Sequence, residues 1–298
     1  MRVADLGEFG LIERISMRLR LDSTVIKGSG DDCAVLKFNR DKYLLATCDM
    51  LVEGVDFLSK DAAYWIGRKA LAVSLSDIAA CAGIPRHCLV SLGMPKDTPL
   101  KRVDGIIKGM ADLARTFKVN IVGGDLSRAG RLTLNVSMLG IVEKKYLVLR
   151  NGAKAGDVIF VSGALGGSLK GKHLRFTPRV KEARFLVKNF KINSMIDISD
   201  GLLQDLRQIL RQSKAGAVVY ETLIPVAKAA TGLSQALYQG EDFELLFTMS
   251  PRQAVRLFKK NADTFHPIGE ITAEKYGLRL INKNNRLTRP QLKGFRHF

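Results

Sequence analysis

Apolar residues follow two different spacings along the first half of the chain. Three segments have apolar residues at every third or fourth position, which predicts amphipathic or buried helices at 9–20, 62–82 and 101–118. Between them lie shorter apolar runs bounded by Gly, Pro or polar residues, which predict strands at 43–47, 88–94, 120–122 and 132–142. Helices that alternate with strands predict an α/β domain.

Alternating strands and helices are predicted again after residues 147–156, where a domain boundary is expected. The stretch NGAKAGDVIFVSGALGGS combines a turn, a strand at 158–161 and a glycine-rich loop. Further strands are predicted at 194–198, 217–220 and 243–249, and helices at 202–212, near Gln235 and at 251–261. We therefore predict two α/β domains with mixed sheets, 1–149 and 150–298.

Composition excludes several classes of protein. Of the 298 residues 46% are hydrophobic, which excludes a disordered chain. Apolar segments are broken well short of the ~18 residues of a membrane span, and the first residues show no signal peptide, so no membrane partner is expected. The four cysteines form no CxxC pair, which disfavours a disulfide scaffold or a zinc ribbon. A reduced, cytoplasmic location is expected.

The net charge of +18 indicates an anionic partner. Residues 1–149 hold 22 basic and 17 acidic residues, whereas residues 150–298 hold 25 and 12. The densest basic stretch, 170–191, has few aromatic residues and no nucleic-acid-binding motif. A solvated helix face that attracts small anions is therefore favoured, and a nucleic-acid patch is the less favoured alternative.

The acidic residues gather beside glycine or serine at predicted strand ends and within one apolar helix. These positions are Asp31, Asp32, Asp49, Asp77, Asp125, Asp197, Asp200, Asp205, Glu241, Asp242 and Glu244. One such acid alone is more often a helix cap or a turn residue. Asp77 differs, because it lies in the apolar segment LAVSLSDIAACAG and a buried carboxylate needs a partner. Carboxylates in such a cluster suit Mg²⁺, which also binds substrate phosphates.

Two stretches resemble phosphate-binding loops without meeting their requirements. GGSLKGKH, at 166–173, matches GxxxxGK but continues with His173 where the P-loop needs Ser or Thr for its metal. GSGDD, at 28–32, carries acids that repel a pyrophosphate unless a metal intervenes. Both stretches favour a nucleotide that is bound through metal ions.

Nine motifs, in this order, resemble the thiamine-monophosphate kinase family, whose superfamily includes aminoimidazole ribonucleotide synthetase and selenophosphate synthetase. They are GEFGLI, GDDCAVL, TCDMLVEGV, KALAVSLSDIAACAG, VNIVGGD, RNGAKAGDVIFVSGALGGS, IDISDGLLQDL, GEDFELLF and GFRHF. The resemblance covers essentially the whole chain. It implies the two-domain aminoimidazole ribonucleotide synthetase-like fold, a homodimer formed through the amino-terminal sheet, and an active site in the cleft between the domains.

The resemblance also implies a reaction, in which ATP phosphorylates thiamine phosphate to thiamine diphosphate with several Mg²⁺ ions. The metal positions of the family match Asp32, Thr47, Cys48, Asp49, Asp77, Asp125, Asp197 and Asp200. Asp49, Asp77 and Asp200 are the catalytic candidates among them. The ATP positions match Gly124, Asp125, Arg150 and Ser199, and the substrate positions match Asp56, Glu241 and Phe295.

Three positions depart from the family pattern. Asp56 stands where His is usual, Cys48 where Ser or Thr is usual, and Leu126 follows GGD in place of Thr. The absence of a catalytic His or Cys is expected, because an acceptor phosphate with a second pKa near ~6 is already mostly dianionic at neutral pH. Two alternatives stay open: another ATP-dependent enzyme of the superfamily, or a basic nucleic-acid-binding protein on this fold.

Overall fold

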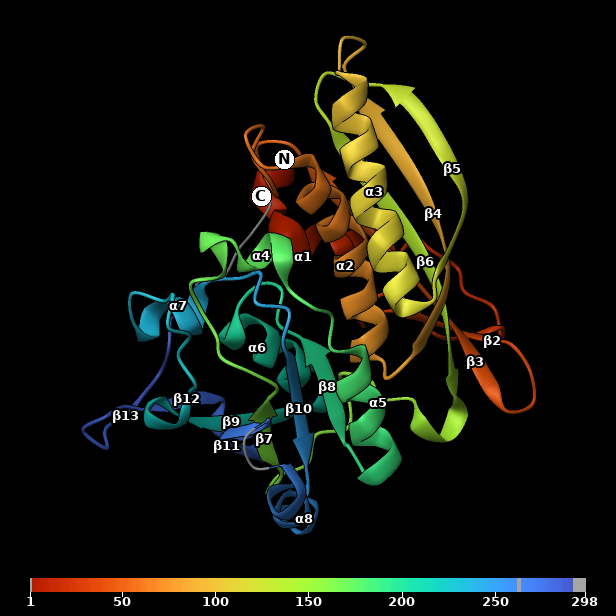
Figure 1. Ribbon diagram of the computed structural model, residues 1–298. Coiled ribbons are helices and arrows are strands. Elements are labelled where there is room, and N and C mark those ends of the chain that lie inside the picture. Colours follow the sequence, from red (N-terminus) through yellow and green to blue (C-terminus); the bar gives the residue numbers. More distant parts are fainter. Residues whose placement is uncertain (1, 262–263, 292–298) are drawn as a thin grey trace.

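Two mixed sheets, one in each half of the chain, organise the computed structural model, which describes residues 2–261 and 264–291 (Figure 1). The first half contains α1 (Val3–Ser16), β1 (Val25–Lys27), β2 (Ala34–Lys37), β3 (Lys42–Val52), α2 (Ala63–Ala80), β4 (Ile84–Met94), α3 (Leu100–Phe117), β5 (Asn120–Arg128), β6 (Thr133–Glu143) and the 3₁₀ turn η1 (Lys144–Tyr146). The strand order is β1-β2-β3-β6-β4-β5, and every neighbouring pair is antiparallel except β4 and β5.

The second half builds a seven-stranded sheet in the order β13-β12-β9-β11-β7-β10-β8. Its elements are β7 (Val158–Val161), η2 (Ser168–Lys170), α4 (Lys172–Arg175), α5 (Val180–Asn189), β8 (Ser194–Asp197), α6 (Leu202–Ser213), β9 (Ala215–Tyr220), η3 (Glu221–Leu223), α7 (Leu233–Tyr238), β10 (Leu245–Met249), α8 (Pro251–Asn261), β11 (His266–Ala273), η4 (Glu274–Tyr276), β12 (Leu278–Ile281) and β13 (Leu287–Thr288). Apolar side chains of α6 and α7 form one core with this sheet, and those of α5 and α8 form another.

Helices α2 and α3 lie together on one face of the first sheet (Figure 1). Glycine permits their close contact, because a Cβ on Gly67 would lie 1.9 Å from the carbonyl oxygen of Ile106. The opposite face of the sheet is open, and apolar side chains are exposed on it. Met50, Leu89 and Leu139 are the large exposed ones. The sheet is thus covered on one side only.

Alternation along β3 separates its polar side chains onto these two faces. Thr47 and Asp49 share the face of the buried residue Leu45, toward α2. Cys48 and Met50 lie on the open face and are exposed. The strand therefore presents its polar atoms to α2 at the end where α2 carries Asp77.

The structure confirms the mixed α/β class and most of the predicted elements. The helices predicted at 62–82 and 101–118 correspond to α2 and α3, whereas the one predicted at 9–20 is α1, which begins and ends earlier. The predicted strands at 88–94 and 120–122 are parts of longer strands. The elements that were not predicted are β1, β2, β11, β12, β13, α4 and the 3₁₀ turns. The sheets divide between Glu143 and Val158, and a boundary at 149/150 within that stretch stays a prediction. Among the described residues, no helix is both long and apolar enough to span a membrane.

Candidate functional site

Three acids from distant parts of the sequence converge where the two sheets meet. Asp32 precedes β2, Asp77 lies on α2, and Asp197 ends β8. One carboxylate oxygen of each lies within 4.8 Å of those of the other two. Asp32 and Asp197 are buried and Asp77 is partly buried, so the structure brings together three of the predicted metal ligands.

Arg150 is the cation that faces this cluster. Its guanidinium donates to both oxygens of Asp32, at 2.9 Å from Nη2 and 3.3 Å from Nε, in the forked geometry typical of arginine. Its backbone N–H donates to the carboxylate of Asp31 at 3.2 Å. Burial, followed by the charge of Asp32, raises the pKa of Asp31 to about 7. Lys27 adds a second cation 3.8 Å from Asp31, so Arg150 and Lys27 balance only part of the negative charge.

Hydroxyl groups hold the remaining acids in place. Ser74 donates to Asp49 at 2.7 Å, Ser76 donates to Asp197 at 2.6 Å, and Thr47 donates to Asp77. Burial raises the pKa of Asp197 to about 8, and burial followed by the charge of Asp49 raises the pKa of Asp77 well above its usual value. Burial also raises the pKa of Asp49. These carboxylates repel one another, which is the condition that a bound divalent cation relieves.

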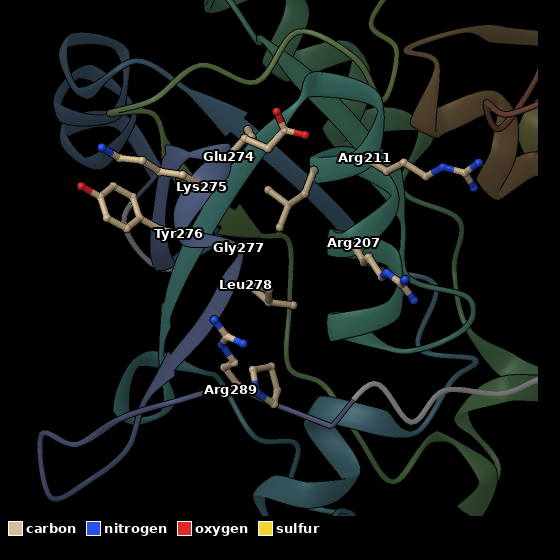
Figure 2. A pocket seen from close by; sticks show the side chains of 11 residues that line it. Arg207, Arg211, Glu274, Lys275, Tyr276, Gly277, Leu278 and Arg289 are labelled. Atoms are coloured by element: carbon tan, nitrogen blue, oxygen red, sulfur yellow. The ribbon is translucent and has the colours of Figure 1, made fainter.

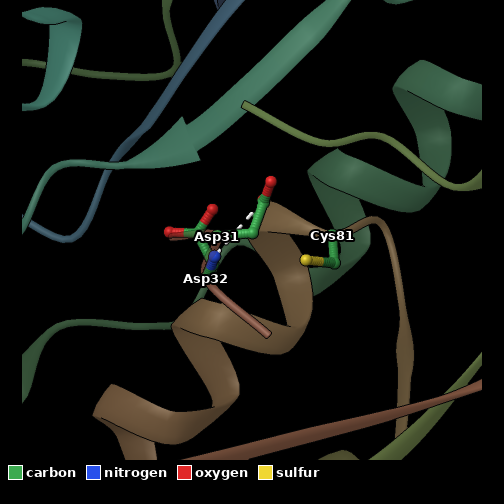
Figure 3. Close-up of side chains that lie close together, drawn as sticks. All are labelled: Asp31, Asp32 and Cys81. Carbon is green, nitrogen blue, oxygen red and sulfur yellow. Dashed lines mark hydrogen bonds between the residues drawn. The ribbon is translucent and has the colours of Figure 1, made fainter. Parts of the chain in front are cut away.

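Two thiols lie beside the same acids. Figure 3 shows Cys81, which follows α2, next to Asp31 and Asp32, and their ligand atoms lie within 4.8 Å of one another. Burial, followed by a hydrogen bond with Cys81, raises the pKa of Cys33 well above its usual value. The hydrogen bond with Cys33 lowers the pKa of Cys81, but burial and the charge of Asp32 raise it above its usual value. A protonated, buried thiol is a poor metal ligand. The all-carboxylate group is therefore the better candidate for a hard cation.

A cavity of about 550 Å³ opens beside the cluster. Asp31 and Arg150 line it, together with Ser199, Asp200 and residues along α1 and most of α6. Asp205 on α6 accepts hydrogen bonds from the backbone N–H groups of Asp200 and Gly201 at 3.1 Å, so this turn is held from within the protein. Two predicted ATP contacts and one predicted metal ligand thus line one space of a size suited to a nucleotide.

A smaller pocket, of about 120 Å³, is lined by both predicted substrate residues that the structure describes. Asp56 and Glu241 line it with Val55, Leu169 and Gly240. The carboxylate of Asp56 accepts a hydrogen bond from the backbone N–H of Val52 at 2.7 Å. Glu241 forms an ion pair with Lys69. The third predicted substrate residue, Phe295, lies outside the described residues.

Three predicted residues do not reach the acid cluster in this chain. The thiol of Cys48 lies on the open face of the sheet, opposite Thr47 and Asp49, and contacts Asn135 and Ser137. The side chain of Cys48 therefore points away from the acid cluster, because successive residues of a strand point to opposite faces, and a metal contact at this position stays a prediction. Gly124 and Asp125 lie on the exposed edge strand β5. Within the described part of the chain, Asp125 belongs to neither group of converging acids.

Gly124 also has a packing role that the sequence did not indicate. A Cβ at this position would lie 1.7 Å from the carbonyl oxygen of Val90, so only glycine permits β5 to approach β4 here.

Sequence reasoning missed three polar residues that hold the site together. Lys69, Ser74 and Ser76 all lie on α2 and are buried. They stand in the apolar segment from which only Asp77 was selected. Three further polar side chains inside such a segment were a usable signal, because buried polar groups need partners.

Another pocket, in the second half, contains none of the predicted site residues. It has a volume of about 410 Å³ and lies between α6, η4 and β12. Figure 2 shows the guanidinium groups of Arg207 and Arg211 pointing away from Leu278. These cations line the pocket with their stems and do not converge on a common point.

Comparisons with known proteins cover both halves of the chain. Residues 30–142 match the family described as AIR synthase related protein, N-terminal domain, and residues 149–281 match its C-terminal domain. The thiamine-monophosphate kinase of Buchnera aphidicola subsp. Schizaphis graminum is 34% identical, covering 99% of each chain. That of Bacillus subtilis is 33% identical, covering 98% of this chain and all of the relative.

Solved structures agree over the same length. The structure described as "AaThiL complexed with AMPPCP and TMP" has a TM-score of 0.88 and 30% identity, and covers 100% of this chain and 99% of its own. Thiamine-monophosphate kinase from Stenotrophomonas maltophilia has a TM-score of 0.73 and 32% identity, and the match covers 92% of this chain and 96% of the other. The structure of the HypE–HypF complex shares the fold, with 19% identity and a TM-score of 0.77. The match covers 95% of this chain and 99% of the other.

Proposed function

Because the chain belongs to the thiamine-monophosphate kinases of the AIR synthase related family, we propose that it transfers the terminal phosphoryl group of ATP to thiamine phosphate, giving thiamine diphosphate and ADP. The observation that carries this proposal is the full-length match to a relative complexed with AMPPCP, an ATP analogue, and TMP. The convergence of Asp32, Asp77 and Asp197 beside the 550 Å³ cavity supports it, because phosphoryl transfer needs charge neutralisation next to the nucleotide.

We assign Mg²⁺ to the acid cluster. The donors are carboxylates, the ligands that Mg²⁺ prefers, and three of them converge. Burial raises the pKa values of Asp77 and Asp197, so keeping both carboxylates charged is costly unless a cation joins them. Asp32, Asp77 and Asp197 would hold the ions, with Asp49 and Asp200 at the edges of the cluster. When bound, the ions would offset the repulsion between the phosphate groups of the two substrates.

The residues of the chain itself bind and orient the two substrates. Arg150 is fixed by Asp32 and supplies a constant positive charge at the mouth of the nucleotide cavity, where Ser199 and Asp200 form one wall. Glu241 and Asp56 line the acceptor pocket at the other end of α2. No residue is required to remove a proton, because the acceptor phosphate is already mostly dianionic at neutral pH.

We also propose a homodimer that covers the open face of the first sheet. That face exposes Met50, Leu89 and Leu139. A set of exposed apolar side chains on one sheet is typical of an interaction surface. A cytoplasmic location remains a prediction.

The direct test is conversion of thiamine phosphate to thiamine diphosphate by the purified protein with Mg²⁺ and ATP. Product is expected, and it should disappear with EDTA or when unphosphorylated thiamine replaces thiamine phosphate, because thiamine lacks the acceptor phosphate. Thiamine phosphate should also raise the melting temperature, since binding to the native state stabilises it. The absence of both turnover and a thermal shift would contradict the proposal and would favour another ATP-dependent enzyme of the superfamily.

A further inference from the structure

Lys69 is a lysine with no exposed side-chain surface, an unusual state for a charged residue. It lies on α2, eight residues before Asp77. An ammonium group that is removed from water loses its hydration and is retained only where partners replace it. The hydrogen-bond partners of the Lys69 ammonium therefore indicate its role.

Both partners line the predicted acceptor pocket. The ammonium donates to the carboxylate of Glu241 and, at 2.7 Å, to the backbone carbonyl oxygen of Asp56. Asp56 follows β3 in the first half of the chain, whereas Glu241 precedes β10 in the second half. One buried cation thus joins the two walls of the pocket.

The backbone at Glu241 is held in an uncommon conformation. Its φ of 66° lies in the left-handed region, which is costly for a residue with a side chain. Its N–H donates to the carbonyl oxygen of Ser199 at 2.6 Å, and a Cβ on Gly240 would lie 2.3 Å from the same oxygen. The backbone of Gly240 and Glu241 is therefore packed against Ser199, which lines the nucleotide cavity, and the Glu241 side chain is tied to α2 by Lys69.

We propose that Lys69 is a positioning residue for thiamine phosphate, which fixes Glu241 and the Asp56 turn at a set distance from the metal ligands. The helix fixes this distance, because a rise of about 1.5 Å per residue places Lys69 and Asp77 about 12 Å apart along α2. Removal of the ammonium would free Glu241, whose side chain is already partly exposed, to turn toward solvent. This inference rests on the proposed function of the acceptor pocket.

Steady-state kinetics of Lys69→Met, with Arg68→Met as the matched control, test this role. Arg68 is the adjacent cation on α2, and it donates to the carbonyl oxygen of Phe176 rather than to the pocket. Lys69→Met should raise KM for thiamine phosphate about tenfold or more and leave KM for ATP within about twofold, because only acceptor binding is lost. Arg68→Met should move neither KM.

Two further variants separate positioning from general stability. Lys69→Arg keeps the charge, so its KM for thiamine phosphate should lie between those of the native protein and Lys69→Met; it also decides the test if Lys69→Met does not fold. On a Glu241→Gln background, Lys69→Met should add little, because the pair acts as a unit. An equal rise in both KM values, no rise at all, or fully additive effects would overturn the role of Lys69.

Failure of the proposed function gives a different result. If neither the native protein nor Arg68→Met forms thiamine diphosphate, the reaction itself is wrong. If both do so and Lys69→Met has native KM values, only the inference about Lys69 is wrong.

Discussion

The hydroxyl group of Ser76 donates to Oδ2 of Asp197 at 2.6 Å, and this buried bond joins α2 of the first half to the end of β8 in the second. It places a predicted metal ligand from one half against the helix that carries another, Asp77. The candidate metal centre therefore exists only when the two halves are packed together.

Ser76→Ala should weaken that junction. A buried acceptor that loses its donor costs about 1–3 kcal/mol, so the free energy of unfolding should fall by this amount in denaturant titrations. Ser59→Ala, on an exposed turn, is the control and should change stability by less than about 0.5 kcal/mol. Equal stability of the two variants would contradict a structural role for the Ser76 bond.

Asp77→Asn should separate stability from activity. Removal of a carboxylate that repels Asp49, Asp197 and Asp32 should raise the melting temperature in EDTA, because the repulsion is uncompensated without metal. The same change should lower kcat about 100-fold or more, because a group that stabilises the transition state is lost.

Asp112→Asn is the matched control for that variant, since Asp112 lies on the surface of α3 and pairs with Arg115. It should change neither property. A near-native kcat for Asp77→Asn, or for Asp49→Ala, would remove the argument for a metal centre.

The stability of the metal-free protein should depend on pH through Asp31 and Asp197. Their pKa values, about 7 and about 8 in the folded state, exceed the usual value of 3.8, so both carboxyl groups bind protons more tightly when folded. This contribution to stability is complete below about pH 4 and is lost as the pH rises through about 7 and 8. The melting temperature in EDTA should fall over that range.

Added Mg²⁺ should raise the melting temperature more at about pH 8.5 than at about pH 6, because the ion binds the deprotonated carboxylates. Asp197→Asn should flatten the pH dependence in EDTA, whereas Asp112→Asn should keep it. A Mg²⁺ effect that is the same at both pH values would argue against binding at these acids.

Leu89→Glu should dissociate the proposed homodimer. Leu89 is 49% exposed on the open face of β4, and a charge placed there would be buried without a partner in a dimer. Leu100→Glu is the control, because Leu100 is 80% exposed at the start of α3, on the covered side of the sheet. Light scattering should report a dimer for the native protein and the control, and a monomer for Leu89→Glu. A monomeric native protein would end this proposal.

Element positions were largely predictable, because they depend on local patterns. The apolar periodicity of α2 and the alternation in β6 stand in the sequence itself, and the ranges predicted for these two elements match the observed ones to within two residues. Short strands such as β1 were missed, since three residues carry too little pattern to separate a strand from a loop.

By itself the sequence determined the mixed α/β class, the family, and a set of acids in the right order, because these are properties of residue type and spacing. Only the tertiary structure decided which of those acids meet. Asp32, Asp77 and Asp197 converge because the two halves pack along α2, whereas Cys48 faces away because it alternates with Thr47 and Asp49 along β3, and packing places α2 on their side. The pairing of Lys69 with Glu241 joins residues far apart in the chain, so it follows from packing and not from any local pattern.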